Sequence, residues 1–561
     1  MNDLPIFPPA GQRRRIALPP GSADSQVISG LASQSRRLLV LTQTAQDAAR
    51  LVEEMAWFAP GLGTHLLPDW ETLPYDPLSP HPDLVSERLS ALWLAAAGKV
   101  DVLVTPAATA MQRLCPPGYL DAHAFLLKEK DTLNADKLRS RLAQAGYSAV
   151  NQVLSPGEFA MRGGIFDLFP MGGEQKSALP YRIDLFDDEI ESIRTFDPDT
   201  QRTLYKVAEI HLLPAREVPL DEAGVTRFRQ NFRDRFEGDP GKSQVYKDVS
   251  NKLAPGGIEY YLPLFFDETA TLFDYLGDDT VLVLHGDTQA AVEGFWNDTQ
   301  SRHRLMRGDK QRPMLAPDAL FLPPDQFFGL LKPYARIDFG GRAEAEQVLA
   351  FQAAPAVEVE RKAENPYYRL QAHLDSFPGR TLLIAESLGR RETLANALAE
   401  YGLKPALMEG WPLGVKGEGS GDKVQTAAAP TLHPFALTTG PLATGFIDQS
   451  TDLAVITETE LYARSPVTRR AREGKRATTA EGLLKDLSEL KIGDPVVHAQ
   501  HGIGRYQGLS GMDMGNGEEE FLNLEFAGGD KLYVPVAHLH LISRSRSDNS
   551  RVLIPVMLQP L

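Results

Sequence analysis

Three adjacent acids, residues 187–189, follow the alternating segment "YRIDLF" (181–186). An apolar strand that ends in carboxylates is one way in which nucleotide-hydrolysing proteins hold Mg²⁺, so an ATP site is the first chemistry to test. Such a site needs G-x-x-x-x-G-K-[ST] between a strand and a helix, because backbone amides and the lysine hold the phosphates. The nearest match, "FEGDPGKS" (236–243), has Phe236 in place of the first glycine and follows a charged helical segment. We interpret the acids as a solvated turn, with contact to basic groups of a partner as the alternative.

Other catalytic patterns are equally incomplete. His498, His501, His538 and His540 have no acidic or cysteine partner at a metal-ligand spacing, and packed or surface histidines are the simpler interpretation. Cys115 lies in "RLCPPG" without a cation that would activate it, and there is no G-x-S-x-G. The sequence nominates no catalytic residue and no metal ligand.

Composition narrows the class of protein. A chain of 561 residues predicts about three to four domains. With 58 basic and 74 acidic residues, the net charge of −16 argues against a surface that coats nucleic acid, so any basic face must be local. A single cysteine excludes an internal disulfide. No apolar run reaches the ~18 residues of a membrane span, and the N-terminal segment lacks a signal-peptide core, so we expect a cytoplasmic protein without membrane contact.

Strands and helices alternate along the first 115 residues. "RRLLVLTQ" (36–43) is typical of a buried strand, and Thr44 is placed to cap the amphipathic helix that follows. This pattern predicts a parallel sheet with crossover helices. From about 120 to 213, after a helix at 134–146, short alternating segments predict an antiparallel sheet. Because "TVLVLHGD" (280–287) restores the first pattern, we interpret this sheet as an insertion.

A third α/β unit begins near residue 365. "TLLIAES" predicts a strand, "LGRRETLANALAEYG" a helix and "LAVITETELY" a closing strand. A Gly/Ser-rich loop (414–430) interrupts this unit, and a basic, Pro-punctuated linker (463–478) follows it. After a helix at 480–490, alternating segments with frequent glycines predict a small barrel.

Several long motifs resemble one known family. "DWETLPYDPLSPHPDLVSERLSAL" (69–92), "RGGIFDLFP" (162–170) and "YRIDLFDDEIESIRTFDPDTQRT" (181–203) resemble the N-terminal, UvrB-like module of the bacterial transcription-repair coupling factors (Mfd). "GDPVVHAQHGIGRYQG" and "DKLYVPVAHLHLISR" are similar to their RNA-polymerase-interacting, CarD-like domain. The resemblance runs from about residue 10 to 545, in the order of the family.

The resemblance implies an α/β multi-domain fold. It comprises a degenerate UvrB/helicase-like parallel-sheet domain with an inserted α+β domain, a second small α/β domain and a C-terminal Tudor-like small β-barrel. The expected boundaries are 1–118 and 214–345 for the two halves of the UvrB-like domain, 119–213 for the insert, 346–462 for the small α/β domain, 463–479 for the linker, 480–548 for the barrel domain and 549–561 for an atypical tail.

The resemblance also implies a function in transcription-coupled DNA repair, in which the chain binds the RNA polymerase β subunit and recruits UvrA. In the family, ATP, Mg²⁺ and DNA translocation belong to motor domains that follow the barrel domain, so we expect no cofactor and no enzyme activity in this chain. The first strand agrees, because it runs into "LTQTAQDAARL" with neither the glycine nor the lysine of a phosphate site. The alternative is a nucleotide-dependent remodelling enzyme that retains ATP binding in its first domain.

Carried over by motif, the UvrA-binding candidates are Arg162, Arg182 and Phe186. Arg182, Asp184 and Phe186 share one strand face by period-two alternation, and an arginine beside an aromatic ring suits a protein-binding hot spot. The alternative is that Phe186 is core and Arg182 pairs with Asp184 or a neighbouring acid.

The candidates for RNA polymerase contact lie on the first strand pair of the barrel and on "KLYVPV", where an exposed edge could add a strand from the partner. They are Val497, His498, Ala499, Arg505, Tyr506, Lys531, Leu532 and Tyr533. Some of these residues must fill the barrel core, for which Val496, Leu532 and Val534 are the expected positions. In the basic linker, DNA contact competes with a solvated tether for Arg469, Arg470, Arg472, Lys475 and Arg476. In the full-length family, DNA is a further partner.

Overall fold

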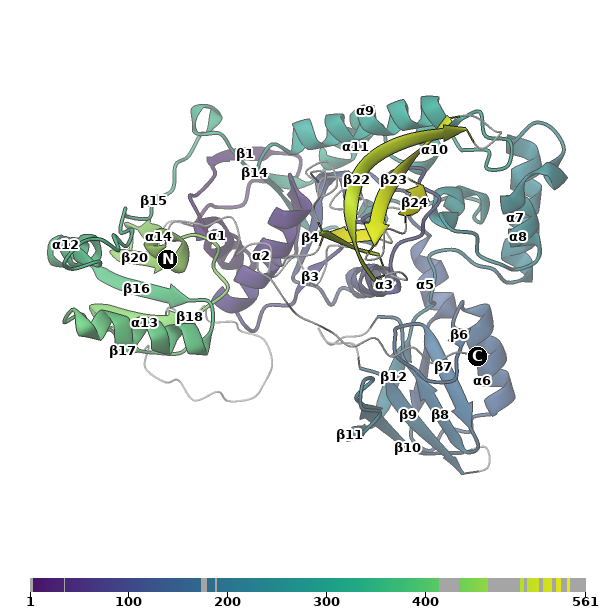
Figure 1. Ribbon diagram of the computed structural model, residues 1–561, viewed down its shortest axis with the longest axis horizontal. Helices are drawn as coiled ribbons and strands as arrows, with labels where there is room; N and C mark the ends of the chain where they lie inside the picture. The colour runs from purple at the N-terminus through teal and green to yellow at the C-terminus, as the bar shows by residue number, and fades with distance from the viewer. Residues whose placement is uncertain are drawn as a thin grey trace. The chain divides into compact units, whose positions relative to one another are not determined.

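The computed structural model of the protein describes residues 4–34, 36–172, 179–186, 189–412 and 433–462 in a first unit, Met1–Ala463 (Figure 1). In a second unit, Arg464–Leu561, it describes residues 495–498, 502–513, 518–526, 531–535 and 542–544. Across these ranges, the structure shows no helix with the length and apolar character that a membrane span requires.

A six-stranded parallel sheet lies at the centre of the first unit. In spatial order its strands are β1 (Arg13–Ala17), β14 (Ala335–Gly340), β13 (Val281–His285), β2 (Leu38–Thr42), β4 (Val102–Pro106) and β3 (Thr64–Leu66). Every residue of β2, β4 and β13 is buried. Parallel strands that are covered on both faces are apolar throughout, which is why "RRLLVLTQ" predicted a buried strand without alternation. The predicted parallel sheet is confirmed.

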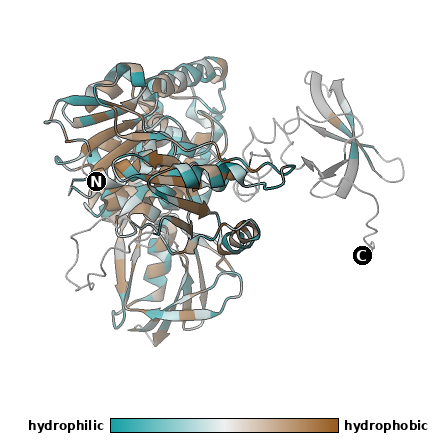
Figure 2. Ribbon diagram, turned by 90° about the vertical axis from the view of Figure 1, so that its left-hand side faces the viewer, coloured by the Kyte–Doolittle hydropathy of each residue, from teal (hydrophilic) through white to brown (hydrophobic). Residues whose placement is uncertain are grey.

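Helices pack on both faces of this sheet. On one face, α1 (Ala23–Ala32) and α2 (Ala45–Phe58) share a core cluster with β2, β4 and β13. On the other, α3 (Pro82–Ala96) and α9 (Thr288–Met306) contribute to the largest core cluster. Thr44 caps α2 as predicted, because its hydroxyl accepts from the Asp47 amide at 3.1 Å. Figure 2 shows the strands in the brown of apolar residues and the surface helices with teal polar positions.

A second, six-stranded sheet is formed by residues between β4 and β13, and we call it the inserted sheet (Figure 1). Its spatial order is β11 (Thr203–Val207), β10 (Glu189–Phe196), β9 (Tyr181–Phe186), β8 (Ile165–Leu168), β7 (Glu158–Arg162) and β6 (Ser148–Ala149). All pairs are antiparallel except β6 with β7. Leu138 and Leu142 of α6 (Ala135–Gln144) belong to the same core cluster as Ile183 and Ile193.

The inserted sheet confirms the antiparallel architecture predicted for this part of the chain. Strand β5 (Phe125–Lys128) pairs with β12 (Glu209–Leu212), so the segments that enter and leave the insert lie side by side. The domain boundaries themselves stay predictions.

A third sheet is mixed, with the order β15 (Phe351–Ala353), β19 (Phe446–Asp448), β20 (Leu453–Thr457), β16 (Arg380–Ala385), β18 (Phe435–Thr439) and β17 (Ala406–Leu407). Helices α12 (Tyr368–Ser376) and α13 (Leu388–Glu400) accompany it. The predicted strand over "LAVITETELY" is too long. It ends at Thr457, where the Thr457 and Glu460 side chains form a capping box that starts α14 (Glu458–Leu461).

Further helices of the first unit connect these sheets along the chain. They are α4 (Ala107–Ala110), α5 (Pro117–His123), α7 (Glu222–Arg235), α8 (Gln244–Ser250), α10 (Pro317–Leu320) and α11 (Pro324–Leu331), with 3-10 turns η1 (Pro240–Lys242), η2 (Ile258–Leu264), η3 (Leu272–Tyr275) and η4 (Arg342–Glu344). The segment "FEGDPGKS" therefore joins helix α7 to helix α8 through η1. A phosphate loop would need a strand on one side, so this segment is not one.

The described strands of the second unit form one antiparallel sheet. Its order is β24 (Lys531–Pro535), β23 (Glu518–Phe526), β22 (Gly502–Asp513), β21 (Pro495–His498) and β25 (Ile542–Arg544). Tyr506, Leu522 and Leu524 are its buried side chains among those described. The strand prediction is confirmed, whereas closure into a Tudor-like barrel stays a prediction.

A fully buried ion pair joins α3 to the segment that follows the insert. Arg88 Nε lies 2.7 Å from Glu217 Oε1, and Arg88 Nη1 donates to the Pro68 carbonyl at 2.7 Å. The guanidinium also lies over the Trp70 ring, 5.1 Å from its centroid. Breaking one side of such a pair leaves the other charge buried without compensation.

We expect Arg88→Met to lower the free energy of unfolding by about 3–5 kcal/mol, because Glu217 then keeps an unpaired buried carboxylate. The double variant Arg88→Met/Glu217→Leu should recover most of this loss. Urea denaturation of the two variants and the wild type measures both values. A loss below about 1 kcal/mol in the single variant would contradict the assignment.

Candidate functional site

The outer face of the inserted sheet holds all three predicted UvrA-binding residues. Register places Asp184 of β9 beside Ile165 of β8, which in turn pairs with Arg162 of β7. The alternate positions turn inward, and there Phe166 and Ile183 are fully buried. Because side chains alternate across a strand, Arg162, Arg182 and Phe186 lie on one surface of the sheet.

Arg182 is held by an acid that the sequence analysis did not single out. Its Nε and Nη2 donate to the two carboxylate oxygens of Asp167 at 2.7 and 2.9 Å, and its guanidinium lies over the Phe196 ring, 4.8 Å from the centroid. The hydrogen bond to Asp167 raises the pKa of Arg182. The alternative prediction, that Arg182 pairs with Asp184 or a neighbouring acid, is correct for a neighbouring acid, Asp167, and wrong for Asp184. Register decides this, because Asp167 lies directly opposite Arg182.

Asp184 has different partners on the same face. It accepts a hydrogen bond from the Ser192 hydroxyl at 2.6 Å and forms an ion pair with Arg194, both from β10. Ser192 lies opposite Asp184 in the register and Arg194 lies opposite Arg182. The face therefore carries two internal ion pairs, Arg182–Asp167 and Arg194–Asp184, which fix the arginine side chains before any partner binds.

Phe186 is the most exposed aromatic side chain of this face. It is 71% exposed at the end of β9, so the alternative that it is core is wrong. Ile165 is 40% exposed, and Arg162 is exposed with its Nη2 donating to the Asn151 carbonyl at 2.9 Å. An aromatic ring with an aliphatic and an arginine side chain on a rigid sheet is suited to protein binding.

A glycine pair brings these residues together. Gly163 has φ of +59° in the two-residue turn between β7 and β8, which is a conformation that favours glycine. A Cβ on Gly164 would lie 2.9 Å from the Leu185 carbonyl oxygen, and the Leu185 amide donates to the Gly164 carbonyl at 2.8 Å. The turn therefore packs directly against β9, beside Phe186. Ile165 was missed from sequence, although its place after "RGG" in an alternating strand was the available signal.

The polymerase-contact candidates fall in the second unit. On β24, Tyr533 is 41% exposed, Lys531 is exposed and Leu532 is half-buried. On β22, Arg505 is exposed. Tyr506 is buried, so it supports the sheet and offers little contact area. Strand β21, which contains Val497 and His498, pairs with both β22 and β25, and its edges are therefore occupied. Among the described strands, β24 and β25 are the two terminal strands of the sheet.

Some predicted residues lie outside the described ranges. They are Ala499 and the basic-linker residues Arg469, Arg470, Arg472, Lys475 and Arg476, together with the acids at 187 and 188. Glu189 starts β10 and is exposed. In the described part of the chain no three His, Cys, Asp or Glu side chains are grouped as metal ligands. Burial raises the pKa of the Cys115 thiol to about 12, so this cysteine is a poor nucleophile.

A buried polar network links α1 and α2 to His285, the last residue of β13. Arg50 Nη2 donates to Asp24 at 2.7 Å and Arg50 Nη1 to Glu54 at 2.9 Å, and His285 Nε2 lies 2.8 Å from Asp24. Burial alone would raise the pKa of Asp24, but hydrogen bonds from His285 and Arg50 outweigh burial and lower it to about 2. Burial raises the pKa of Glu54.

The same network ties the third sheet to the first. Glu54 accepts from the Ser22 hydroxyl at 2.8 Å and from the Ala443 amide at 2.9 Å. Next to it, Trp57 Nε1 donates to the Thr439 carbonyl at 3.0 Å. The network therefore joins α1 and α2 to the segment around Ala443 in the third sheet's part of the chain.

Three protein-family models match the chain. The UvrB interaction domain matches residues 125–218, the MFD, D3 domain matches residues 373–461, and the CarD-like/TRCF RID domain matches residues 490–546. The fold and these matches define a multi-domain protein that combines a UvrB interaction domain with a CarD-like domain.

Curated relatives are similar over almost the whole chain. A transcription-repair-coupling factor of Haemophilus influenzae is 41% identical over 551 residues, which cover 97% of this chain and 46% of the relative. The Escherichia coli protein of the same name is 39% identical, covering 95% and 45%, and that of Bacillus subtilis is 26% identical, covering 93% and 44%. This chain corresponds to the N-terminal portion of the transcription-repair-coupling factors. It spans somewhat less than half the length of the relatives it matches.

Arg182→Ala should destabilise the inserted sheet by about 1–3 kcal/mol, because it leaves Asp167, which is only 3% exposed, without its donors. Phe186→Ala should change stability by less than about 0.5 kcal/mol, because the ring is mostly in water. Thermal unfolding of both variants, with amide hydrogen exchange over residues 158–196, measures the difference. Equal losses in the two variants would refute the assigned roles.

Asp24→Asn should lower the free energy of unfolding at pH 7 by about 2 kcal/mol, the equivalent of the lowered pKa. Because the folded-state pKa lies below the ordinary value of 3.8, the carboxylate stabilises the protein above pH 4 and loses this effect as pH falls toward 2. Urea denaturation at pH 7, 4 and 3 should show the gap between variant and wild type narrowing with acid. A gap that widens with acid would exclude this sign.

Proposed function

We propose that this chain is a non-catalytic adaptor of transcription-coupled DNA repair, which binds UvrA through the inserted sheet and the RNA polymerase β subunit through the second unit. The observation that supports it most directly is Phe186, an exposed aromatic residue next to Arg162 and Ile165 on a sheet inside the matched UvrB interaction domain. A surface of this kind, formed without catalytic groups, is suited to holding a protein partner.

The contact surface proposed for UvrA has an exposed apolar centre, and internal ion pairs hold the charged side chains beside it. Phe186 and Ile165 supply apolar area that a partner would bury, and Arg162 supplies donors at the rim. Arg182 acts differently, since it donates to Asp167 and its guanidinium lies over the Phe196 ring. We assign it the role of a positioning residue, while Phe186 and Arg162 make the direct contacts.

For the polymerase, the proposed contact is strand β24 with Lys531 and Tyr533, whose side chains are exposed. The match of residues 490–546 to the CarD-like/TRCF RID domain supports this assignment. The sheet order supports strand addition at β24 rather than at β21, because β21 has a neighbour on each side. The Tudor-like barrel and the contact of the basic linker with DNA are part of the same proposal.

We further propose that this chain does not hydrolyse ATP and needs neither Mg²⁺ nor another cofactor for its adaptor function. The helix α2 begins with its own cap, and Asp24, Arg50 and Glu54 fill the ends of the central strands. The segment "FEGDPGKS" joins two helices. An ATPase assay on the purified chain tests this part of the proposal.

In a binding titration against purified UvrA, Phe186→Ala and Arg162→Ala should each weaken binding at least about tenfold, as expected for hot-spot residues. Leu305→Ala is the matched control, because Leu305 is an apolar side chain that is 85% exposed on α9, outside the inserted sheet. It should leave the affinity unchanged. Full affinity in Phe186→Ala would remove the inserted sheet from the proposed contact.

In a pull-down with the isolated RNA polymerase β subunit, Tyr533→Ala should weaken capture at least about fivefold, and Lys531→Ala should weaken it less, because an aromatic anchor buries more area than a rim charge. Neither variant should affect UvrA binding. Capture that depends on Leu305 or Phe186 but not on Tyr533 would place the polymerase contact outside the second unit.

A further inference from the structure

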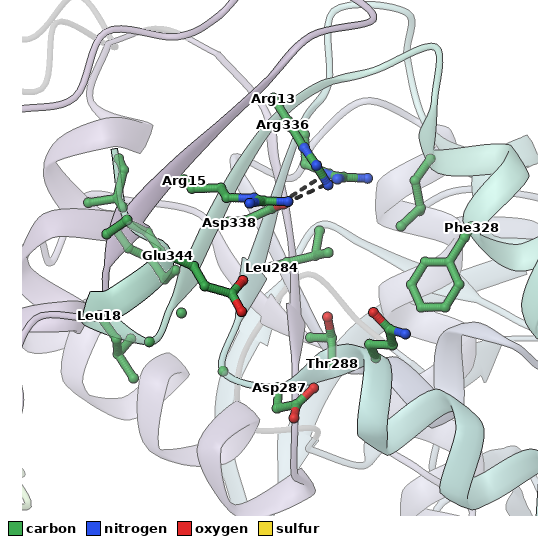
Figure 3. Close-up of a pocket in the computed structure, with 18 of the residues that line it drawn as sticks. Arg13, Arg15, Leu18, Leu284, Asp287, Thr288, Phe328, Arg336, Asp338 and Glu344 are labelled. Atoms are coloured by element: carbon green, nitrogen blue, oxygen red, sulfur yellow. Dashed lines mark hydrogen bonds and ion pairs between the residues drawn. The ribbon is translucent and has the colours of Figure 1, made fainter. Parts of the chain in front are cut away.

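A large open groove lies on the parallel sheet, lined by β1, β14 and the segment that follows β13 (Figure 3). Its volume is about 1550 Å³, and its floor is the face of β1 and β14 that carries Arg13, Arg15, Arg336 and Asp338. On the opposite face of the same strands, Ile337 is buried in the core and Arg14 lies beside it. Parallel sheets are normally covered on both faces, so the uncovered face of β1 and β14 is a candidate ligand site.

The floor of the groove has an excess of positive charge. Arg13 lies directly opposite Arg336 in the strand register, and Arg15 lies opposite Asp338. Asp338 is engaged by Arg336, at 2.8 Å from its Nε. Among the residues that the structure describes, the side chains of Arg13 and Arg15 have no hydrogen-bonding or ionic partner, although their backbones pair with β14. Like charges on paired strand positions destabilise a sheet, and a bound anion would offset this repulsion.

The far side of the groove has the opposite character. Asp287 precedes α9, Glu293 lies on α9, and Asp325 lies at the start of α11. Between the two sides, the Phe328 ring of α11 faces the groove, and Figure 3 shows Asp287 across the cavity from Arg13 and Arg336. A ligand that fits must be anionic at one end, rich in hydrogen-bond donors at the other and flat enough to stack.

We propose that this groove binds a nucleoside phosphate. Its phosphates would pair with Arg13 and Arg15, because guanidinium groups bind phosphate oxygens in a bidentate way. Its base would stack on Phe328, and its sugar hydroxyls or base amino group would donate to the carboxylates of the far side, as acidic residues do for ribose in dinucleotide-binding sheets.

The charge pattern excludes the two main competitors. A nucleic-acid strand or an acidic peptide is negative along its whole length, and one side of this groove would repel it. The groove also lacks a phosphate loop, so the ligand is bound and not hydrolysed. The site shares no residue with the proposed UvrA and polymerase contacts and does not depend on them.

The test is a titration of the whole chain into fluorescently labelled ADP, followed by anisotropy, with unlabelled ADP and inorganic pyrophosphate as competitors. The double variant Arg13→Ala/Arg15→Ala should weaken ADP binding at least about tenfold, the loss expected when charge-assisted phosphate contacts are removed. Arg14→Ala is the matched control, since it removes the same charge from the same strand, and Arg14 lies beside Ile337 on the other face. It should change the affinity less than about twofold.

Phe328→Ala separates the two ends of the ligand. It should weaken ADP at least about threefold through lost stacking and leave competition by pyrophosphate unchanged. On addition of ADP, amide hydrogen exchange should slow at residues 11–18 and 335–345. Because the Arg13 and Arg15 side chains have no stabilising partner and Arg13 lies opposite the like-charged Arg336, their substitution should not lower the thermal unfolding temperature, so loss of binding reports on the groove.

Other outcomes overturn the proposal. No saturable binding of labelled ADP, equal weakening by Arg14→Ala, or unchanged binding by the double variant would each exclude a nucleotide at this groove. Pyrophosphate binding without any preference for ADP would exclude the nucleoside end of the ligand. Tighter binding of a labelled single-stranded oligonucleotide than of ADP, lost in the double variant, would replace the nucleotide with a nucleic-acid strand.

Discussion

The pairing of β2 with β13 is the constraint on which the first unit depends. These strands are neighbours at the centre of the parallel sheet, and all their residues are buried. A buried strand cannot leave its backbone groups unpaired, so β13 must pair with β2 although the inserted sheet separates them in the sequence. The inserted sheet is therefore anchored at both ends, and the β5–β12 pair and the buried Arg88–Glu217 contact hold its entry and exit. These contacts at both ends of the insert hold its outer face in place relative to the parallel sheet.

The polar network beside the end of β13 carries buried charge that is compensated within the chain. A ligand-binding sheet of this type leaves the ends of its strands and the start of a helix open to an anion. Here Asp24 and Glu54 supply the negative charge from within the chain, and Arg50 and His285 neutralise it. Since Glu54 also accepts from the amide of Ala443, this network joins the third sheet to the first.

Arg182 and Phe186 have different roles on the outer face of the inserted sheet. Arg182 donates hydrogen bonds to Asp167 and its guanidinium plane lies over the Phe196 ring. These contacts fix the side chain and leave fewer of its donors for a partner. Phe186 makes no such contact and remains in water. An exposed aromatic ring is unfavourable in the free protein and favourable once a partner covers it, which makes it the natural anchor of an interface.

Much of this protein was determined by the sequence alone. Apolar runs and caps such as Thr44 fixed local elements, because hydrophobic periodicity and capping act within a few residues. Long motifs such as "RGGIFDLFP" predicted the family, and the absence of glycine and lysine after the first strand predicted a lost phosphate site. Only the tertiary structure decided which acid holds Arg182, because strand register brings Asp167 opposite it from a separate strand. It also decided that β21 is enclosed, that Tyr506 is core, and that Arg13 and Arg15 share an uncovered groove. Each of these depends on contacts between distant segments, which local periodicity does not encode.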